Sequence, residues 1–160
     1  MQQIVRTFWI ILKPLYRLHV RFFRPLTLGV RAIVLDGEGR VLLVRHSYVD
    51  GWYLPGGGVE RGETALSAVT REIDEEAGIL LKAGERLQQL GFLANFREFK
   101  SDHVVLYLVG PTQYESVART SFEIAEYGFY AIDDLPAETT RGTRARLLEF
   151  KNGTPAPDMW

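Results

Sequence analysis

The sequence predicts an α+β domain in which a mixed β-sheet lies between helices, and two observations lead to this fold class. First, apolar and β-branched residues gather in short runs that are separated by turn residues, as strands do. Second, the elements follow the order strands, helix, strands, helix. The chain of 160 residues shows no internal repeat and no linker, so we expect one folded domain over residues 28–151.

The first strands are predicted on either side of an Asp-Gly turn. Residues 28–36 (LGVRAIVLD) alternate in polarity, and residues 41–46 (VLLVRH) form a second apolar run. The turn DGEGR joins them, so we expect a β-hairpin. Pro55 and three glycines follow in GWYLPGGG, which predicts a loop.

A helix is predicted from about Thr64 to Ala77. It is followed by Gly78, a residue suited to a left-handed cap. Apolar residues recur at helical spacing and should anchor this helix to the sheet. They are Leu66, Val69, Ile73 and Ala77.

The second half of the chain contains three more strand patterns and one more helix. Two strands are expected within residues 87–99 and 102–110, joined around Lys100 and Ser101, and a third within 126–132. The last helix is expected near Thr140–Phe150, and the tail, residues 152–160, has no regular pattern.

Residues 1–27 form a basic and apolar N-terminal arm. The first 35 residues contain six cations and no acid. The arm is too interrupted by charges to span a bilayer, which takes about 20 mostly apolar residues. We favour packing of this arm on its own domain or on a second copy, which would give a homodimer. Binding to a membrane surface is the alternative.

Composition excludes several kinds of chemistry. The chain has no cysteine, which removes disulfides, thiolate nucleophiles and sulfur-ligated metals together. Its net charge of −1 provides no field that would select a polyanion, so no nucleic-acid partner is indicated. The absence of cysteine suits a reducing compartment, so we expect a cytoplasmic location.

Three carboxylates share one face of the predicted helix 64–77. Glu72, Glu75 and Glu76 fall within a 100° arc that we expect to be exposed, directly after the glycine-rich loop. Like charges at this spacing repel by about 0.2–0.5 kcal/mol per pair, so a positive partner is indicated. Clustered oxygen ligands suit Mg²⁺ or Mn²⁺. The ordinary alternative is a solvated acidic helix face.

The spacing of these residues decides between the two interpretations. Gly57 is followed after five residues by Glu63, and after seven more by REIDEEAGI, which ends at Ile79. This stretch matches every fixed position of the Nudix box, so the chain resembles the Nudix hydrolase family. The flanking stretches RVLLVRH and GWYLPGGG also resemble the usual surroundings of the box.

The resemblance implies an α/β/α sandwich with a central mixed sheet, and a function. Nudix hydrolases cleave the pyrophosphate linkage of a nucleoside diphosphate linked to another group, and they require Mg²⁺ or Mn²⁺. By position, Glu75 and Glu76 match carboxylates that bind the metal. Glu72 matches one that binds metal or acts as the base, and the Gly57 carbonyl matches a further ligand. The structural positions of the motif are Glu63, Arg71 and Gly78.

A general base outside the box is also common in the family. Glu123 and Glu126 are the candidates, and we favour Glu123. For substrate contacts we name Arg45, Tyr53 and Gly58. Further candidates, each more typical of packing or plain surface, are His46, Asn95, Phe96, Tyr107 and Phe129.

The nucleotide itself stays open. Residues 93–96 (LANF) lack the proline typical of ADP-ribose enzymes and the tyrosine typical of dinucleoside polyphosphate enzymes. The alternatives from other classes are a non-catalytic nucleotide-binding protein and a membrane-peripheral interaction protein on the same fold. A non-catalytic relative should lack some box carboxylates, and this chain has them all.

Overall fold

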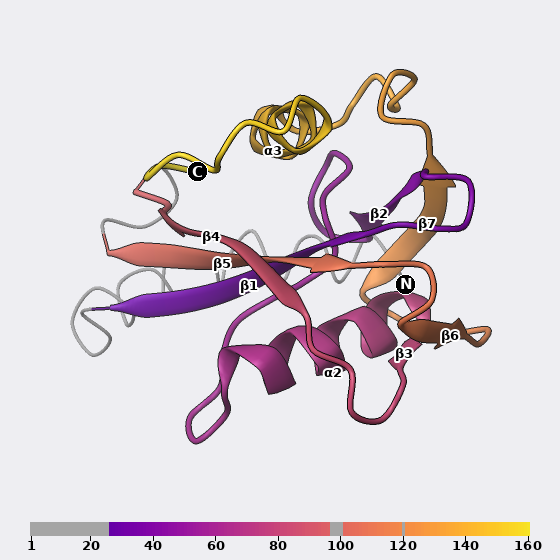
Figure 1. Ribbon diagram of the computed structural model, residues 1–160, viewed down its shortest axis with the longest axis horizontal. Helices are drawn as coiled ribbons and strands as arrows, with labels where there is room; N and C mark the ends of the chain where they lie inside the picture. The colour runs from indigo at the N-terminus through magenta and orange to yellow at the C-terminus, as the bar shows by residue number, and fades with distance from the viewer. Residues whose placement is uncertain (1–25, 97–100, 120) are drawn as a thin grey trace.

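The computed structural model describes residues 26–96, 101–119 and 121–160 (Figure 1). The predicted arm, residues 1–27, lies outside the described residues except for Leu26 and Thr27. Along the described chain the elements are β1 (Thr27–Val34), β2 (Val41–His46), α2 (Ala65–Ala77), β3 (Ile79–Leu81), β4 (Gln88–Ala94), β5 (Asp102–Val109), β6 (Tyr114–Ser116), β7 (Ile124–Tyr130) and α3 (Arg141–Lys151).

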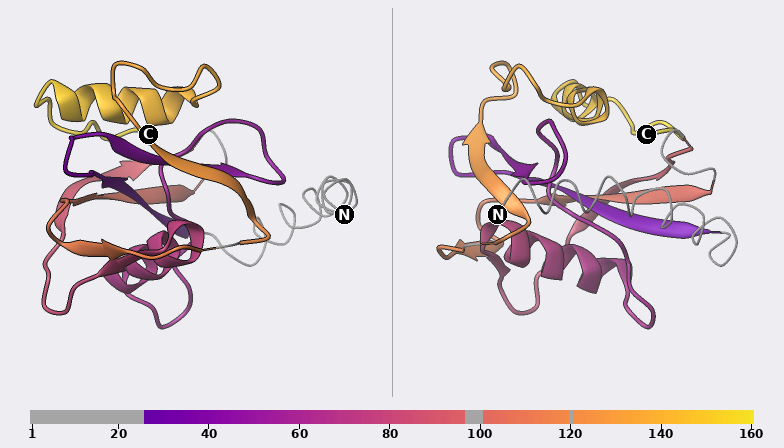
Figure 2. Two further views of the ribbon diagram at one scale, coloured as in Figure 1. Left: turned by 90° about the vertical axis from the view of Figure 1, so that its right-hand side faces the viewer. Right: turned by 180° about the vertical axis from the view of Figure 1, so that it is seen from behind.

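The described elements form layers, with α2 on one side of the strands and α3 on the other (Figures 1 and 2). Each helix closes its own apolar cluster. Val30 of β1 packs in the cluster that contains Val69 and Ile73 of α2. Ile33 of β1 belongs to the cluster that contains Leu147 of α3. Residues of β1 therefore support both layers, and the predicted α+β sandwich is confirmed.

The central sheet is mixed. Its strand order is β1-β5-β4, with β1 parallel and β4 antiparallel to β5. The remaining strands form two antiparallel pairs, β2 with β7 and β3 with β6. The two strands predicted on either side of Lys100 and Ser101 are confirmed as β4 and β5, and they pair antiparallel. β3 and β6 were not predicted, because three residues are too few for a periodic pattern.

The predicted hairpin of β1 and β2 is wrong beyond its turn. The turn itself forms, since Asp36 N donates to Arg40 O at 3.0 Å, and one bridge joins Leu35 to Val41. β1 then pairs with β5 over its whole length and β2 pairs with β7. Both strands are buried, so packing on the helices and longer ladders outweigh a local turn signal.

Helix α2 begins and ends as predicted. Thr64 Oγ1 accepts from Ser67 N at 3.0 Å and Ser67 Oγ accepts from Thr64 N at 2.9 Å, which makes a capping box. Gly78 ends the helix with φ 65°, a left-handed cap. The predicted anchor Leu66 is wrong, because 42% of it is exposed, and Ala68 is buried instead.

The C-terminal tail, residues 152–160, has neither helix nor strand but is anchored to β4. Ala94 N donates to Asp158 O at 2.8 Å, and Trp160 N donates to Ala94 O at 2.9 Å. Arg146 of α3 donates to Met159 O at 2.7 Å, and its guanidinium lies 5.7 Å from the centre of the Trp160 ring. The tail thus connects α3 to the edge of the sheet.

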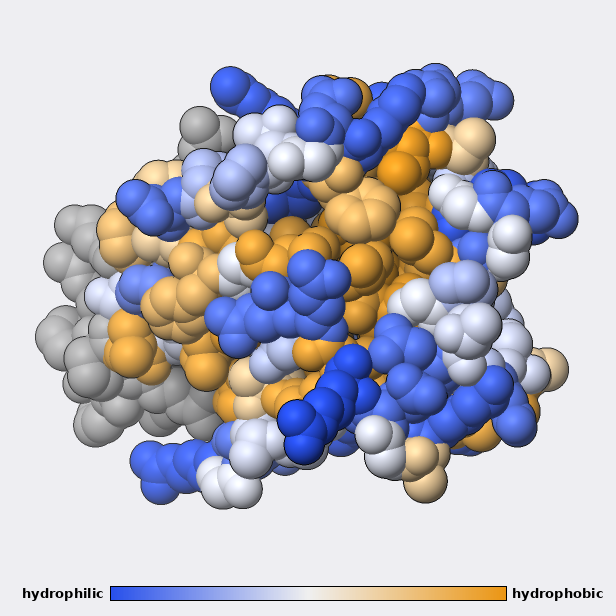
Figure 3. Space-filling model, in the orientation of Figure 1, coloured by the Kyte–Doolittle hydropathy of each residue, from blue (hydrophilic) through white to orange (hydrophobic). Residues whose placement is uncertain are grey.

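The face shown in Figure 3 has apolar side chains across its middle, with hydrophilic ones above and below. Among the exposed large apolar residues, Phe92 and Phe96 both pack on His103. Their ring centroids lie 5.2 and 5.6 Å from that of His103. No helix in the described part of the chain is long and apolar enough to cross a membrane.

Candidate active site

The glycine-rich loop lies along the edge of β1 that β5 leaves open. Val30 N donates to Gly57 O at 2.8 Å and Ala32 N donates to Pro55 O at 3.0 Å. Gly56, between these two residues, has φ 137°, and a Cβ there would lie 2.1 Å from Val30 O. No other residue fits this position, because both its backbone conformation and its distance from β1 exclude a side chain.

The three glutamates of α2 differ in their surroundings, although they share one helix face. Glu76 is buried, at 8% exposure, which contradicts the expected exposed site. The side chain of Glu72 is 15% exposed and that of Glu75 is 60% exposed. The helix therefore presents carboxylates at three depths, from the solvent to the buried end near β2.

The loop and α2 meet through backbone and carboxylate. Gly56 N donates to Glu76 Oε2 at 2.8 Å. A Cβ at Gly57 would lie 2.4 Å from Glu72 Oε1, so the Glu72 carboxylate occupies the space that a side chain would need. The two glycines allow a backbone approach that places two carboxylates directly against the loop.

Arg71 connects the loop to the helix. Its Nε donates to Glu63 Oε1 at 3.1 Å and its Nη2 to Gly58 O at 3.2 Å. Its Nη1 donates to Glu72 Oε1 at 2.8 Å and to Glu75 Oε2 at 3.2 Å. One guanidinium thus bonds to three carboxylates and one backbone carbonyl, a fork geometry that lysine could not reproduce.

Carboxylates and the Gly57 carbonyl are the oxygen donors that Mg²⁺ or Mn²⁺ takes, so the donor set fits such an ion. Within the described ranges, however, no three acidic or histidine side chains are gathered closely enough to hold a metal. One oxygen of each of the three carboxylates already accepts a hydrogen bond, from Arg71 at Glu72 and Glu75 and from Gly56 N at Glu76.

Burial dominates the electrostatics of the carboxylates. It raises the pKa of Glu76 to about 8, against the opposing charge of Arg31 and the hydrogen bond from Gly56. It also raises the pKa of Glu72, against the hydrogen bond and charge of Arg71. A further cation close to Glu72 and Glu76 would therefore favour the ionised form of both carboxylates.

His46 lies beside Glu76, with its Nε2 3.8 Å from Glu76 Oε1. Burial, and then the charge of Arg31, lower the pKa of His46 to about 4. Its Nδ1 is buried without a hydrogen-bond partner among the described residues, and its ring contacts those of Tyr48 and Tyr53. The imidazole is therefore neutral at pH 7 and covers the buried end of the acidic face.

The two candidate bases occupy different environments. The charge of Glu123, which is exposed, raises the pKa of buried Glu76, so Glu123 lies near the α2 carboxylates. It also contributes, after burial, to raising the pKa of Tyr48 to about 12. Glu126 instead bonds to Arg45 across the β2–β7 pair at 2.7 Å. Glu126 is thus paired with a cation, and the preference for Glu123 as the base stays a prediction.

Of the three predicted substrate contacts, Gly58 and Tyr53 lie beside the acidic site, and Arg45 lies on the β2–β7 pair. Gly58 lies in the loop and its carbonyl accepts from Arg71. Tyr53 packs edge-on against His46, 5.6 Å between centroids. Arg45 bonds to Glu126 and lies over the Trp52 ring, so it belongs to the β2–β7 surface.

The remaining candidates have packing or structural contacts elsewhere. Phe96 packs on His103, and Asn95 Nδ2 donates to Asp102 Oδ2 at 3.0 Å. Tyr107 is buried in the cluster under α2, and Phe129 packs against that cluster. Two residues near the acids were missed by sequence reasoning, Arg31 and Tyr48. The sequence signal for Arg31 was a lone charge inside the apolar run of β1, and Tyr48 had none.

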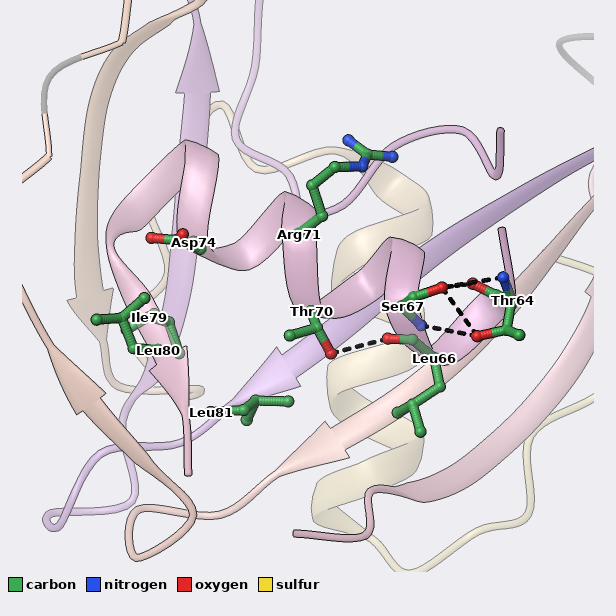
Figure 4. A pocket seen from close by; sticks show the side chains of 9 residues that line it. All are labelled: Thr64, Leu66, Ser67, Thr70, Arg71, Asp74, Ile79, Leu80 and Leu81. Atoms are coloured by element: carbon green, nitrogen blue, oxygen red, sulfur yellow. Dashed lines mark hydrogen bonds between the residues drawn. The ribbon is translucent and has the colours of Figure 1, made fainter. Parts of the chain in front are cut away.

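A hollow of about 580 Å³ lies between α2 and β3, and none of the three glutamates lines it (Figure 4). Leu66, Leu80 and Leu81 supply its apolar wall, and Arg71 points away from Leu66 and Leu81. Its hydroxyl groups are already bonded, since Thr70 donates to Leu66 O and Ser67 bonds to Thr64. The hollow therefore shares Arg71 with the acidic site but none of its glutamates.

The structure thus joins an α+β sandwich to a glycine-rich loop packed against an acidic helix, which is the arrangement that the box predicted. The family model described as NUDIX domain matches residues 25–150, and the chain therefore belongs to the Nudix family. The family membership that the box predicted is confirmed.

Solved and curated relatives agree with this assignment. The MutT Nudix hydrolase of Burkholderia pseudomallei aligns with a TM-score of 0.60 and 30% identity, covering 76% of this chain and 95% of that one. A MutT-like protein of Streptomyces ambofaciens is 27% identical, covering 79% of this chain and 78% of its own. The RNA pyrophosphohydrolase of Halorhodospira halophila is 47% identical over 57 residues, which are 36% of this chain.

The last match is local. The chain spans 30% of the length of that RNA pyrophosphohydrolase, and 21% and 35% of the next two curated relatives.

Proposed function

We propose that this chain is a metal-dependent hydrolase that cleaves the pyrophosphate linkage of a nucleotide or nucleotide derivative. The observation that carries the proposal is the loop–helix contact, in which Gly56 N binds Glu76 while Gly57 leaves room for the Glu72 carboxylate. The names of relatives support the substrate class, since one is an RNA pyrophosphohydrolase and another an 8-oxo-dGDP phosphatase.

The proposed metal ligands are the Gly57 carbonyl and the carboxylates of Glu72, Glu75 and Glu76. When bound, Mg²⁺ or Mn²⁺ would neutralise phosphate oxygens and make a water nucleophilic at neutral pH. Arg71 would keep the loop and the helix in place, because it bonds Glu63 and Gly58 O in addition to Glu72 and Glu75.

Glu123 is the proposed general base. It is exposed, and its charge acts on the pKa of buried Glu76. In the proposed reaction it accepts the proton of the attacking water, while Gly58 and Tyr53 contact the substrate. Glu72, which is largely covered and bonded to Arg71, is the alternative base.

A panel of nucleotides tests the proposal. Nucleoside triphosphates, 8-oxo-dGDP, ADP-ribose, nucleotide sugars, dinucleoside polyphosphates and 5′-triphosphorylated RNA would be incubated with Mg²⁺ or Mn²⁺, and the products separated by chromatography. We expect cleavage between phosphates, and loss of activity in excess chelator that either metal reverses. Full activity in chelator would contradict the metal requirement. A folded protein that binds nucleotides but cleaves none would favour a non-catalytic binding function instead.

A further inference from the structure

The glycine-rich loop is bonded from two directions, and Arg31 provides one of them. In an extended segment, successive carbonyls point to opposite sides. The carbonyls of Pro55 and Gly57 accept from the backbone of β1. The carbonyls of Leu54 and Gly56, which alternate with these two, both accept from Nη1 of Arg31, at 3.3 Å for Leu54.

Gly56 is the point where this cation and an acid of α2 meet. Its carbonyl accepts from Arg31, and its N–H donates to Glu76 Oε2 at 2.8 Å. Gly56 has no side chain and a Cβ would overlap β1, so its own polar contacts are made by its backbone groups alone. Loss of either side-chain partner leaves a polar backbone group of this loop without its bond.

Arg31 also places a positive charge among the acids. Its charge opposes the effect of burial on the pKa of both Glu72 and Glu76, and it helps to lower the pKa of His46. Arg71 is the other guanidinium in the site, and it bonds the more solvent-facing carboxylates. The buried end of the acidic face therefore has its own cation.

We propose that Arg31 is a positioning residue of this site, which holds the Leu54–Gly57 loop so that Gly56 N–H stays on Glu76 and the Gly57 backbone stays against the Glu72 carboxylate. The assignment of these groups as ligands rests on the function proposed above, whereas the effect of Arg31 on the loop does not. Arg31 acts through the loop and makes no contact with the reacting atoms.

The test compares the full chain with Arg31→Met and Arg31→Lys. Methionine keeps the length of the side chain but removes its donors and its charge, and lysine keeps the charge and one donor group. Arg86→Met is the matched control, since Arg86 is exposed in the loop between β3 and β4.

Hydrogen exchange provides the readout that does not depend on activity. In Arg31→Met we expect the peptide that contains Gly56–Gly58 to exchange at least about tenfold faster, with exchange in α3 unchanged. Arg31→Lys should recover a part of the protection, and Arg86→Met should match the parent. Unchanged exchange in the loop, or equally faster exchange throughout the domain, would overturn the proposal.

Kinetics then separate positioning from substrate contact. With a substrate found on the panel, Arg31→Met should lower kcat about tenfold or more and raise the Mg²⁺ concentration for half-maximal rate. The KM for the nucleotide should change less than about threefold, and lysine should restore part of kcat. A rise in nucleotide KM with unchanged kcat would overturn positioning in favour of direct contact.

The two proposals fail separately. If the parent chain cleaves nothing on the panel, the proposed function is wrong, and the exchange measurement still decides the role of Arg31. If the parent is active but Arg31→Met retains both its kcat and its loop protection, the proposed function stands and the role of Arg31 is wrong.

Discussion

Helices α2 and α3 each carry an arginine that binds both a backbone carbonyl and a carboxylate, but the two arginines connect different parts of the chain. The side chain of Arg71 on α2 is 29% exposed and bonds to the acids of the candidate site. That of Arg146 on α3 is 5% exposed and bonds to Met159 O and to Glu149 Oε1, at 2.7 and 2.5 Å. The network on α2 connects the glycine-rich loop to the acids of the candidate site, whereas the network on α3 connects the tail to the core.

The ends of the two helices differ as well. α2 has a complete capping box and a left-handed glycine cap. α3 begins at Thr140, whose hydroxyl bonds to that of Thr143 and not to the helix backbone. α2 is thus defined largely by its own sequence, while α3 depends on the tail. Substitutions on α2 should mainly change activity, and those around α3 should mainly change stability.

The largest effect is expected from Glu76→Gln on α2. Loss of a proposed metal-binding charge should lower kcat at least about 100-fold, or roughly 2.7 kcal/mol of barrier. The fold should be nearly unaffected, because glutamine keeps an oxygen that can accept from Gly56 N. Steady-state kinetics and a thermal melt of the same preparation measure both. A variant as active as the parent would remove Glu76 from the proposed ligands.

Trp160→Ala in the tail should reverse this pattern. Trp160 packs with the core cluster under α3 and against Arg146, so its loss should cost about 2 kcal/mol. For a chain of this size the melting temperature should fall by about 4–8 °C, while kcat per folded molecule stays within about twofold.

Met159→Ala is the control for the tail. The Met159 side chain is half exposed and only its carbonyl binds Arg146, so the change should cost less than about 0.5 kcal/mol. Equal melting temperatures for Trp160→Ala and Met159→Ala would show that the tail does not hold α3 through the indole.

The smallest effects should come from the N-terminal caps. Thr64→Ala removes the oxygen that accepts from Ser67 N and should cost about 1 kcal/mol. Thr140→Ala breaks a bond between two hydroxyls and should cost clearly less. Urea unfolding of both variants checks the order. A greater loss for Thr140→Ala would mean that α3 has a cap that its contacts do not reveal.

The same contrast explains what sequence could predict. α2, its loop and its glycine cap were predictable because their signals lie within a few residues, as in Thr64 and Ser67 or in Gly78. The partners of β1 and β2 were not, because a correct turn at Asp36–Arg40 is compatible with strands that diverge into different ladders. Burial of Glu76 was missed because helical periodicity places it on the acidic face but cannot show what covers it.

Arg31 and the tail were missed for a related reason. The contacts of Arg31 with the loop span 23 and 25 residues, and that of Trp160 with Ala94 is longer still. Such contacts leave only a weak local trace. In the site, the roles of the box positions and the preference for Glu123 came from the resemblance to the family, whereas the pairing of Arg45 with Glu126 depends on the register of β2 and β7.

The parallel pairing of β1 with β5 has a consequence for how the chain folds. It joins Thr27 to Asp102, which are 75 residues apart, and the loop and α2 both lie between them. Closing so long a segment has an entropic cost that a local hairpin would avoid, and ladders of this kind form slowly. During synthesis α2 leaves the ribosome before β5 does. The acidic helix can therefore pack on the complete central sheet only after β5 has been made.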